Sequence, residues 1–450
     1  IAWRVSREKF MQNVKWINDL KIRAGYGEAG NNRVADYSYL TTFGQFNPYS
    51  LNNQNIPSWA PPLLSNYYIK WETNVSRNLG LDMSMFNNRV ELVVDLYRNT
   101  AEDLLLSAPV STVLGYSNKI KNIGATVNKG IEVQLNIVPI KTKDFTWSFN
   151  LNNSWNKNTI KRLTPGVDTM LGNSGWSPSG LEDFAAIVGQ PVGAMYGFVT
   201  DGFYTTDDFL PAADPTKYEF VLKPGRIRNS IFSSTIAPGA LKLKDLNGDS
   251  VITSADRTII GNPNPKFTGG LTQQFNYKNF DLSVFINWSV GGDVMNANKI
   301  EFTNSYTPWA NALTDIEGRW KTIDAQGQLV TDLDQLKILN ANATSWLPMP
   351  GKAGNNAFIL HSWGIEDGSF LRINNISLGY TFPKKGLRRA GIQSLRLYGT
   401  VNNIAVITGY SGYDPEVSTR NRAGQLPSPN VDYSAYPRSR SFIFGVNASF

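Results

Sequence analysis

One stretch of the sequence has the residue types and the spacing of a cation-binding loop. In "DLNGDSVITSAD", Asp245, Asn247 and Asp249 stand at positions 1, 3 and 5 of an EF-hand-type loop. Val251 would offer its backbone carbonyl at position 7, and Asp256 stands at position 12. Because hard cations take clustered oxygen ligands, this spacing predicts a structural Ca²⁺ site.

Two departures from the EF-hand pattern keep a second interpretation open. Position 6, normally glycine, is Ser250, and position 12 is the shorter Asp256 where glutamate is usual. Aspartate and asparagine also hydrogen-bond their own backbone in turns, so the loop can hold its shape without an ion. With or without an ion, we expect this loop to stiffen a longer connection and to perform no chemistry.

The other chemically capable residues predict no active site. The chain has no cysteine and a single histidine, His361, which excludes Cys-ligated or His-rich metal centres and disfavours a His-based triad. Glu366 and Asp367 are neighbours in the sequence and cannot be assigned to the two sides of a glycosidic bond. We therefore expect no catalytic residues and a protein that is not an enzyme, with no organic cofactor.

Composition limits the class of protein further. The 43 Lys and Arg residues exceed the 36 Asp and Glu residues, but the excess is spread along the chain, which argues against nucleic-acid binding. The 12 Trp, 19 Tyr and 23 Phe residues favour strands over helices. No window reaches the roughly 18 apolar residues of a membrane helix. The first residues, "IAWRVSREKFMQN", lack the apolar core of a signal peptide.

Several stretches alternate apolar and polar residues over about ten positions. In "GIEVQLNIV", Ile131 and Val133 alternate with Glu132 and Gln134. The same pattern recurs in "RVELVVDLY", "FTWSFNLNN", "FDLSVFINW", "LRLYGTVNN" and "FIFGVNASF". Such strands have one apolar and one wet face, which fits either a soluble antiparallel sandwich or a transmembrane barrel.

Strand length and connection length favour the barrel. Strands of about ten residues cross a bilayer at a tilt, whereas sandwich strands are nearer five or six residues. Connections alternate between short turns and long loops, the largest near 158–265, 292–368 and 404–440, as in barrels with short periplasmic turns and long extracellular loops. In this interpretation Glu91, Asp95, Glu132 and Gln134 face the lumen. The expected strands are 20–27, 37–46, 76–86, 89–99, 128–138, 144–157, 266–277, 279–291, 369–382, 393–403 and 441–450.

Eleven strands cannot close an even-stranded barrel, and an open sheet edge is not tolerated in lipid. We therefore predict an all-β fold, an antiparallel transmembrane β-barrel of which residues 1–450 form the C-terminal half of about 22 strands. An N-terminal plug and the first half of the barrel would lie outside this chain. The last strand ends on an aromatic residue, and its Phe442, Phe444 and Phe450 resemble the signal read by the barrel-assembly machinery of the outer membrane.

Motifs along the whole chain carry a more specific resemblance. They include "WINDLKIRAGYGEAGN", "NLGLDMSMFNNRVELVVDLYRNTAEDLLL", "NIGATVNKGIEVQLN", "PVGAMYGFVTDGFY", "DLNGDSVITSADRTIIGNPNPKFTGGL", "WGIEDGSFLRINNISLGYTFP", "GYSGYDPEV" and "YPRSRSFIFGVNASF". In this order they resemble the C-terminal half of SusC/RagA-type TonB-dependent outer-membrane transporters of the Bacteroidetes.

The resemblance implies active import of a large nutrient, an oligosaccharide or an oligopeptide, across the bacterial outer membrane. It implies a SusD-like surface lipoprotein and the TonB complex as partners, contact with outer-membrane lipid, and a dimer of transporter–lipoprotein pairs as one form of assembly. Coupling to TonB would act through the missing N-terminal part. The alternative is a surface carbohydrate-binding β-protein without transport activity.

Aromatic side chains in the long loops are candidates for stacking on sugars or on peptide side chains. The alternative explanation, packing in the loops or a membrane-interface belt, is favoured for any single one of them. The candidates are Trp176, Tyr306, Trp309, Trp346 and Tyr413.

Overall fold

The fold was analysed in a computed structural model of the chain. The structure describes residues 1–32, 34, 36–61, 64–111, 113, 115–116, 118–177, 180–229, 231, 236–306, 311–346, 349–350, 358–387, 391–419 and 426–450.

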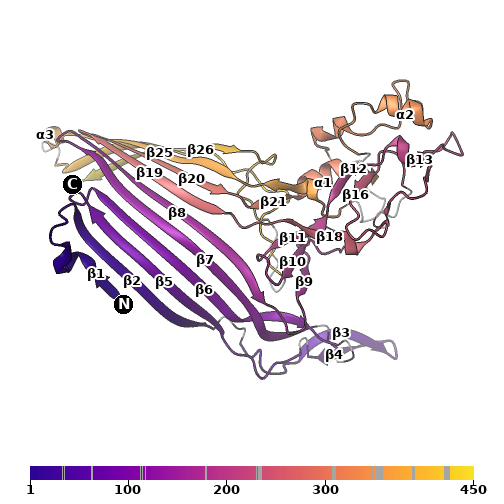
Figure 1. Ribbon diagram of the computed structural model, residues 1–450, viewed down its shortest axis with the longest axis horizontal. Helices are drawn as coiled ribbons and strands as arrows, with labels where there is room; N and C mark the ends of the chain where they lie inside the picture. Colours follow the sequence, from indigo (N-terminus) through magenta and orange to yellow (C-terminus); the bar gives the residue numbers. More distant parts are fainter. Residues whose placement is uncertain are drawn as a thin grey trace.

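One antiparallel sheet of eleven strands dominates the fold (Figure 1). Each strand pairs with the next barrel strand along the chain, so the order in space follows the order in sequence. The strands are β1 (Ala2–Arg4), β2 (Ile17–Asn31), β5 (Glu72–Met85), β6 (Val90–Pro109), β7 (Asn118–Lys141), β8 (Phe145–Arg162), β19 (Phe267–Tyr277), β20 (Phe280–Val290), β25 (Phe370–Thr381), β26 (Ser394–Thr408) and β28 (Ser441–Ser449).

Register keeps the two faces of this sheet chemically distinct. Directly opposed residues point to the same side, so the pairs Asp95–Glu132 and Glu132–Ser154 place polar groups on one face. Leu96 is paired with Ile131 on the other face. A shift of one residue in any pairing would move a whole strand's apolar side chains to the wet face, and this penalty fixes the register.

The two ends of the sheet differ in their connections. At one end the links are tight turns, such as the β5–β6 turn, in which Phe86, Asn87 and Asn88 have positive φ angles of 54–59°. Lys278, with φ 52°, makes the turn between β19 and β20. At the other end, the long connections fold into a lobe (Figure 1). Short strands and short helices build this lobe.

The lobe contains several small sheets. The strands are β9 (Thr169–Gly172), β10 (Phe184–Ile187), β11 (Ala194–Phe198) and β18 (Arg257–Gly261) in one sheet; β21 (Asp293–Asn296), β24 (Ile365–Asp367) and β27 (Val431–Asp432) in another; and the pairs β12 (Thr200–Phe203) with β16 (Leu241–Leu243), β13 (Phe209–Leu210) with β14 (Val221–Leu222), β15 (Arg228–Asn229) with β17 (Val251–Ile252), and β22 (Ser305–Tyr306) with β23 (Met349–Pro350). The helices are α1 (Ala297–Asn304), α2 (Leu333–Leu339) and, at the short-turn end of the sheet, α3 (Lys384–Leu387). In the described part of the chain, no helix is long and apolar enough to span a membrane.

The lobe contains several apolar cores. One core surrounds Phe184, Met195 and Ile300, which are fully buried, and another surrounds Phe209 and Leu336. The long connections therefore fold as packed units and hold their inner segments in fixed positions over the end of the sheet.

One predicted strand is wrong. Residues 37–46 do not join the large sheet; the connection between β2 and β5 instead carries a separate hairpin, β3 (Gly44–Leu51) with β4 (Gln54–Ala60). The eleventh strand is β1, whose three residues pair with Lys21–Arg23 of β2. The predicted total of eleven was right because the extra strand and the missed one cancel.

Candidate functional site

Hydrogen-bonded amide side chains form part of the wall on the polar face of the sheet. Gln134 lies opposite Asn152 in the β7–β8 pairing, and Asn136 lies opposite Asn150, whose amide donates to it. Nearer the lobe, Asn158 donates to Asn128 at 2.9 Å. Amide side chains both donate and accept, so such a wall can exchange bonds with water or with a polar ligand along its whole length.

Long charged side chains lie flat on this wall because glycine makes room for them. Arg23 of β2 reaches across Gly80 of β5 to Asp95 of β6, with a nitrogen–oxygen distance of 3.0 Å. It also donates to Asp82 at 2.9 Å. A Cβ atom at Gly80 would lie 2.5 Å from an Asp95 oxygen and 2.6 Å from the Arg23 guanidinium carbon, so any larger residue there must displace the Arg23–Asp95 pair.

The same device recurs at the other side of the sheet. Arg396 of β26 crosses Gly379 of β25 to bond Asp281 of β20, with its Nε 2.9 Å from the carboxylate. The Tyr398 ring covers Gly445 of β28, where an added Cβ would come within 2.4 Å of the phenol oxygen. Because these side chains lie along the sheet instead of projecting from it, the polar face stays open.

A cavity of about 610 Å³ lies where the polar face meets the lobe. Asp95, Glu132 and Gln134 line it from the sheet, as the alternation of the sequence predicts. Its other walls come from the lobe and from β8, β19, β20 and β25, through residues such as Asn152, Thr268, Asn287, Gly292, Pro415 and Glu416. The lining is a mixture of amides, hydroxyls and carboxylates, so the cavity suits a polar ligand.

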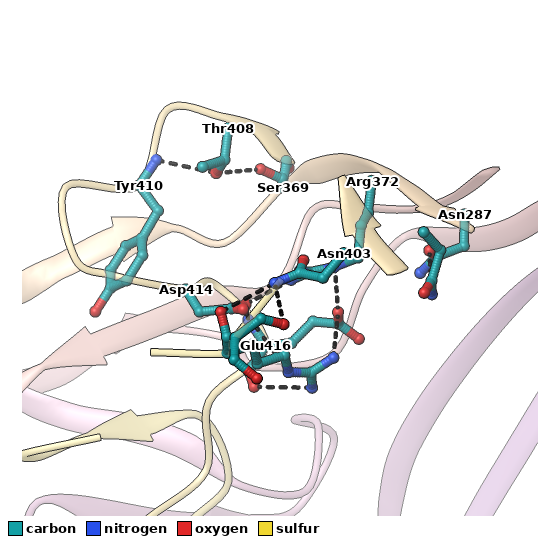
Figure 2. Close-up of polar contacts among 11 residues, drawn as sticks. Asn287, Ser369, Arg372, Asn403, Thr408, Tyr410, Asp414 and Glu416 are labelled. Carbon is teal, nitrogen blue, oxygen red and sulfur yellow. Dashed lines mark hydrogen bonds and ion pairs between the residues drawn. The ribbon is translucent and has the colours of Figure 1, made fainter. Parts of the chain in front are cut away.

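The Arg372 guanidinium lies among polar partners from other segments of the chain (Figure 2). Arg372 of β25 is 1% exposed and donates to Asn403 at 2.6 Å and to Asp414 at 2.7 Å. Its Nε lies 2.9 Å from Glu416, and Arg438 lies 3.1 Å from the same carboxylate. This Arg372 cluster ties the segment 409–419 to β25 and β26, and so positions the Pro415 and Glu416 side chains that line the cavity.

A second polar network joins the lobe segments to each other. Glu366 of β24 accepts from the Ser411 backbone N–H at 2.9 Å and forms an ion pair with Lys299 of α1 at 3.1 Å. These bonds lower the pKa of Glu366 although burial alone would raise it. Tyr410 donates to Asp432 at 2.6 Å. Segments near 299, 366, 410 and 432 therefore form one polar assembly over the end of the sheet.

In the predicted calcium loop, the aspartate side chains accept hydrogen bonds from the backbone of the loop itself. Asp245 Oδ1 accepts from the Gly248 backbone N–H at 2.7 Å, and Oδ2 accepts from that of Ser250 at 2.8 Å. Asp249 accepts from the Val251 N–H at 2.8 Å, and the fully buried Asp256 accepts from Leu246 and Thr253. Backbone bonds of this kind lower the pKa of Asp245. Among the described residues, no three His, Cys, Asp or Glu side chains are grouped to hold a metal ion.

The predicted aromatic contacts differ in their surroundings. Trp176 and Trp346 are each 5% exposed and pack in the cores of the lobe. Contact of either ring with a substrate remains a prediction, and it would require these cores to open. Tyr413 is 80% exposed. Tyr306 belongs to β22, but its side chain, like the whole of Trp309, lies outside the described residues.

The single histidine of the chain lies in the lobe. His361 is fully buried beside Trp346 and Trp363, and no hydrogen-bond partner for either ring nitrogen exists in the described chain. Burial lowers its pKa to about 3.

Phe442 and Phe444 of β28 point to the apolar face and are 65% and 86% exposed. Their role in barrel assembly stays a prediction.

The chain matches the family model described as "TonB dependent receptor-like, beta-barrel" over residues 3–404. The chain belongs to this family. It is 32% identical to TonB-dependent receptor P3 of Formosa agariphila, in an alignment that covers all of this chain and 41% of that protein. It is 27% identical to TonB-dependent receptor SusC of Bacteroides thetaiotaomicron, again over all of this chain and over 39% of that protein.

A solved structure supports the fold of this receptor chain. The structure of the RagAB peptide transporter superposes with a TM-score of 0.73 at 22% identity, covering all of this chain and 43% of that one. The chain thus spans about 40% of the length of the relatives it matches, which agrees with a half-barrel of eleven strands. Receptors of this family are outer-membrane proteins, and so is this one. In such barrels the short turns are periplasmic and the long loops extracellular.

Sequence reasoning missed the roles of Arg372, Gly80 and Gly379. Arg372 looked like one basic residue in a strand, and its partners Asp414 and Glu416 lie more than 40 positions away. Gly80 and Gly379 interrupt alternating strands, and an isolated glycine within a strand is a recognised sign of close approach by another group. That signal was present in the sequence at both positions.

Proposed function

We propose that this chain forms the transport wall of a TonB-dependent importer for a large polar nutrient, an oligosaccharide or an oligopeptide. The observation that carries the proposal is the open polar face of the sheet, which leads from the cavity at the extracellular end toward the periplasmic turns. Arg23 and Arg396 lie flat across glycines on this face. A cargo in extended form would slide along amide groups whose bonds are easily exchanged.

Partners follow from the relatives. Bacteroides thetaiotaomicron SusC is named a TonB-dependent receptor, and RagAB is titled a peptide transporter. We therefore infer that a SusD-like lipoprotein covers the lobe and that TonB supplies the energy through parts of the protein outside these 450 residues. A dimer of transporter–lipoprotein pairs is part of the same proposal. No residue is assigned a catalytic role.

A structural calcium ion in the loop 245–256 is a separate proposal. Asp245, Asn247 and Asp249 keep the spacing of an oxygen cage, and each carboxylate oxygen that accepts a backbone N–H still has a second lone pair. Asn247 donates to Asp249 at 3.0 Å, and its backbone N–H donates to Asp245 at 3.2 Å, so ion binding would exchange some of these hydrogen bonds for metal contacts.

Uptake by cells tests the transport proposal. In a strain whose only source of this receptor is a plasmid, loss of the full-length gene should abolish growth on one defined oligomer and leave growth on its monomer unchanged. Parallel cultures with oligosaccharides and with oligopeptides identify the class of cargo. Surface binding of the oligomer without any uptake, in cells with a working TonB complex, would contradict transport and favour the carbohydrate-binding alternative.

A further inference from the structure

Four basic side chains form a row across four neighbouring strands on the apolar, outward face of the sheet. Arg77 of β5 lies opposite Arg98 of β6, Arg98 opposite Lys129 of β7, and Lys129 opposite Lys157 of β8. All four are exposed. We call these four residues the basic row.

The basic row has no acidic partner within the described chain. Arg77 lies over the Tyr26 ring, 5.5 Å from its centroid, and no ion pair reaches any of the four. Two outward-facing carboxylates on β6 and β2 are engaged elsewhere, since Glu102 pairs with Lys161 and Glu28 accepts from Tyr26. Like charges directly opposite each other destabilise a sheet, and here three such pairs stand side by side. An external anion would relieve this repulsion.

An apolar row lies next to the basic row, two residues along each strand. Its members are again directly opposed, and each side chain is 40–49% exposed. They are Leu79, Leu96, Ile131 and Trp155. Between the two rows a shallow depression of about 540 Å³ is lined by Arg98, Lys129 and Lys157, with Lys266 at its edge and Trp155 at its apolar side.

The position along the strands places the basic row at a membrane boundary. Arg98 lies eight residues beyond Val90, where β6 begins at the periplasmic turn, and Lys157 lies twelve residues beyond Phe145, where β8 begins. A tilted strand needs about 9–11 residues to cross the hydrocarbon core. The basic row therefore lies level with the head groups of the outer leaflet, and the apolar row lies level with the acyl chains beneath them.

We propose that this surface binds an outer-leaflet lipid whose head group carries phosphate. Arg98, Lys129 and Lys157 would hold the phosphate, with the arginine fork able to take two of its oxygens. Leu96, Ile131 and Trp155 would contact the first segments of the acyl chains. The site is on the opposite face of the sheet from the cavity, so it does not depend on the proposed transport function.

Binding of lipid A to the full-length receptor in detergent tests the proposal, measured by native mass spectrometry. The test variant is Arg98→Gln/Lys129→Gln/Lys157→Gln. The matched control is Lys141→Gln/Lys143→Gln/Lys278→Gln, which removes three cations at the periplasmic turns. Lipid A and its dephosphorylated form are added in separate titrations.

We expect the test variant to lose affinity for lipid A at least tenfold and the control to keep it. Dephosphorylated lipid A should bind the parent weakly and the test variant equally weakly. If the test variant does not fold, the single change Lys129→Gln serves, with an expected loss of several-fold. Equal binding of the two lipids by the parent, or equal losses in test and control variants, would overturn the proposal.

Discussion

Replacing Arg372 by methionine should release the extracellular segment 409–419 from the barrel wall. The guanidinium is 1% exposed, and its removal leaves Asp414, which is 5% exposed, without its closest cation. Breaking a buried ion pair by removing one partner costs about 3–5 kcal/mol. Arg438 remains 3.1 Å from Glu416 and 3.7 Å from Asp414, so we expect the lower end, about 3 kcal/mol.

Hydrogen exchange measures this loss directly. A cost of about 3 kcal/mol corresponds to an increase of about 10²-fold in the opening equilibrium of the segment, and hence in the exchange rate of its protected amides. Since Pro415 and Glu416 line the cavity, cargo binding should weaken as well. The measurement uses the full-length receptor in detergent, with peptides covering 409–419 followed by mass spectrometry.

Two further variants separate the buried ion pair from general damage. Arg396→Met removes the partly exposed guanidinium that pairs with Asp281 on the same wall, and it should leave exchange in 409–419 unchanged. Arg372→Met/Asp414→Leu removes both buried charges and should recover much of the protection, because no unpaired carboxylate remains. Unchanged exchange in 409–419 for Arg372→Met alone would refute the assignment of Arg372 as the anchor of this segment.

Three other predictions concern the sheet and the lobe. Gly80→Ala should displace the Arg23–Asp95 pair, lower the thermal stability and narrow the lumen. At Gly25 nothing lies within 4 Å of an added Cβ, so Gly25→Ala should leave the thermal stability and the lumen unchanged. Calcium should raise the melting temperature of the parent and not that of Asp245→Ala; an identical shift in both would contradict the calcium proposal. The pKa of His361 is lowered to about 3 by burial, so the unfolded state takes up a proton first and the lobe loses stability as pH falls from about 6.5 toward 3. His361→Phe should remove this pH-dependent loss. It should also raise the free energy of unfolding by about 1 kcal/mol or more at pH 7, because two partnerless nitrogens are gone. Urea titration across that pH range measures both effects, and an unchanged pH slope would refute the prediction.

Alternation in the sequence was sufficient to predict the large sheet and its two faces. Each residue's side of a strand is set by parity alone, so Glu132 and Gln134 could be assigned to the polar face from "GIEVQLNIV". The strand at 37–46 was misplaced because Gly44–Leu51 does form a strand, but it pairs in a hairpin outside the barrel, and the sequence alone does not show which partner a strand takes. Three-residue β1 was too short to show any period.

The contacts that shape the site depend on register between distant segments, which one sequence does not show. The basic row combines residues 21, 31 and 28 positions apart, so the charge looked evenly spread. His361 is the single histidine of the chain, and tertiary packing beside Trp346 and Trp363 buries it, which its sequence neighbours alone did not indicate. Both outcomes were decided by which segments meet in space.

Single cysteines on the two faces of β7 test the central claim most directly, since the 450 residues contain no native cysteine. Gln134→Cys lies on the polar face and Leu135→Cys on the apolar face. Both are treated in whole cells with a bulky, membrane-impermeant maleimide, and uptake of the radiolabelled cargo is then measured. The account predicts that Gln134→Cys is labelled and its uptake blocked, while Leu135→Cys is not labelled and transports normally. Full uptake through labelled Gln134→Cys would contradict the claim that this polar face lines the transport path.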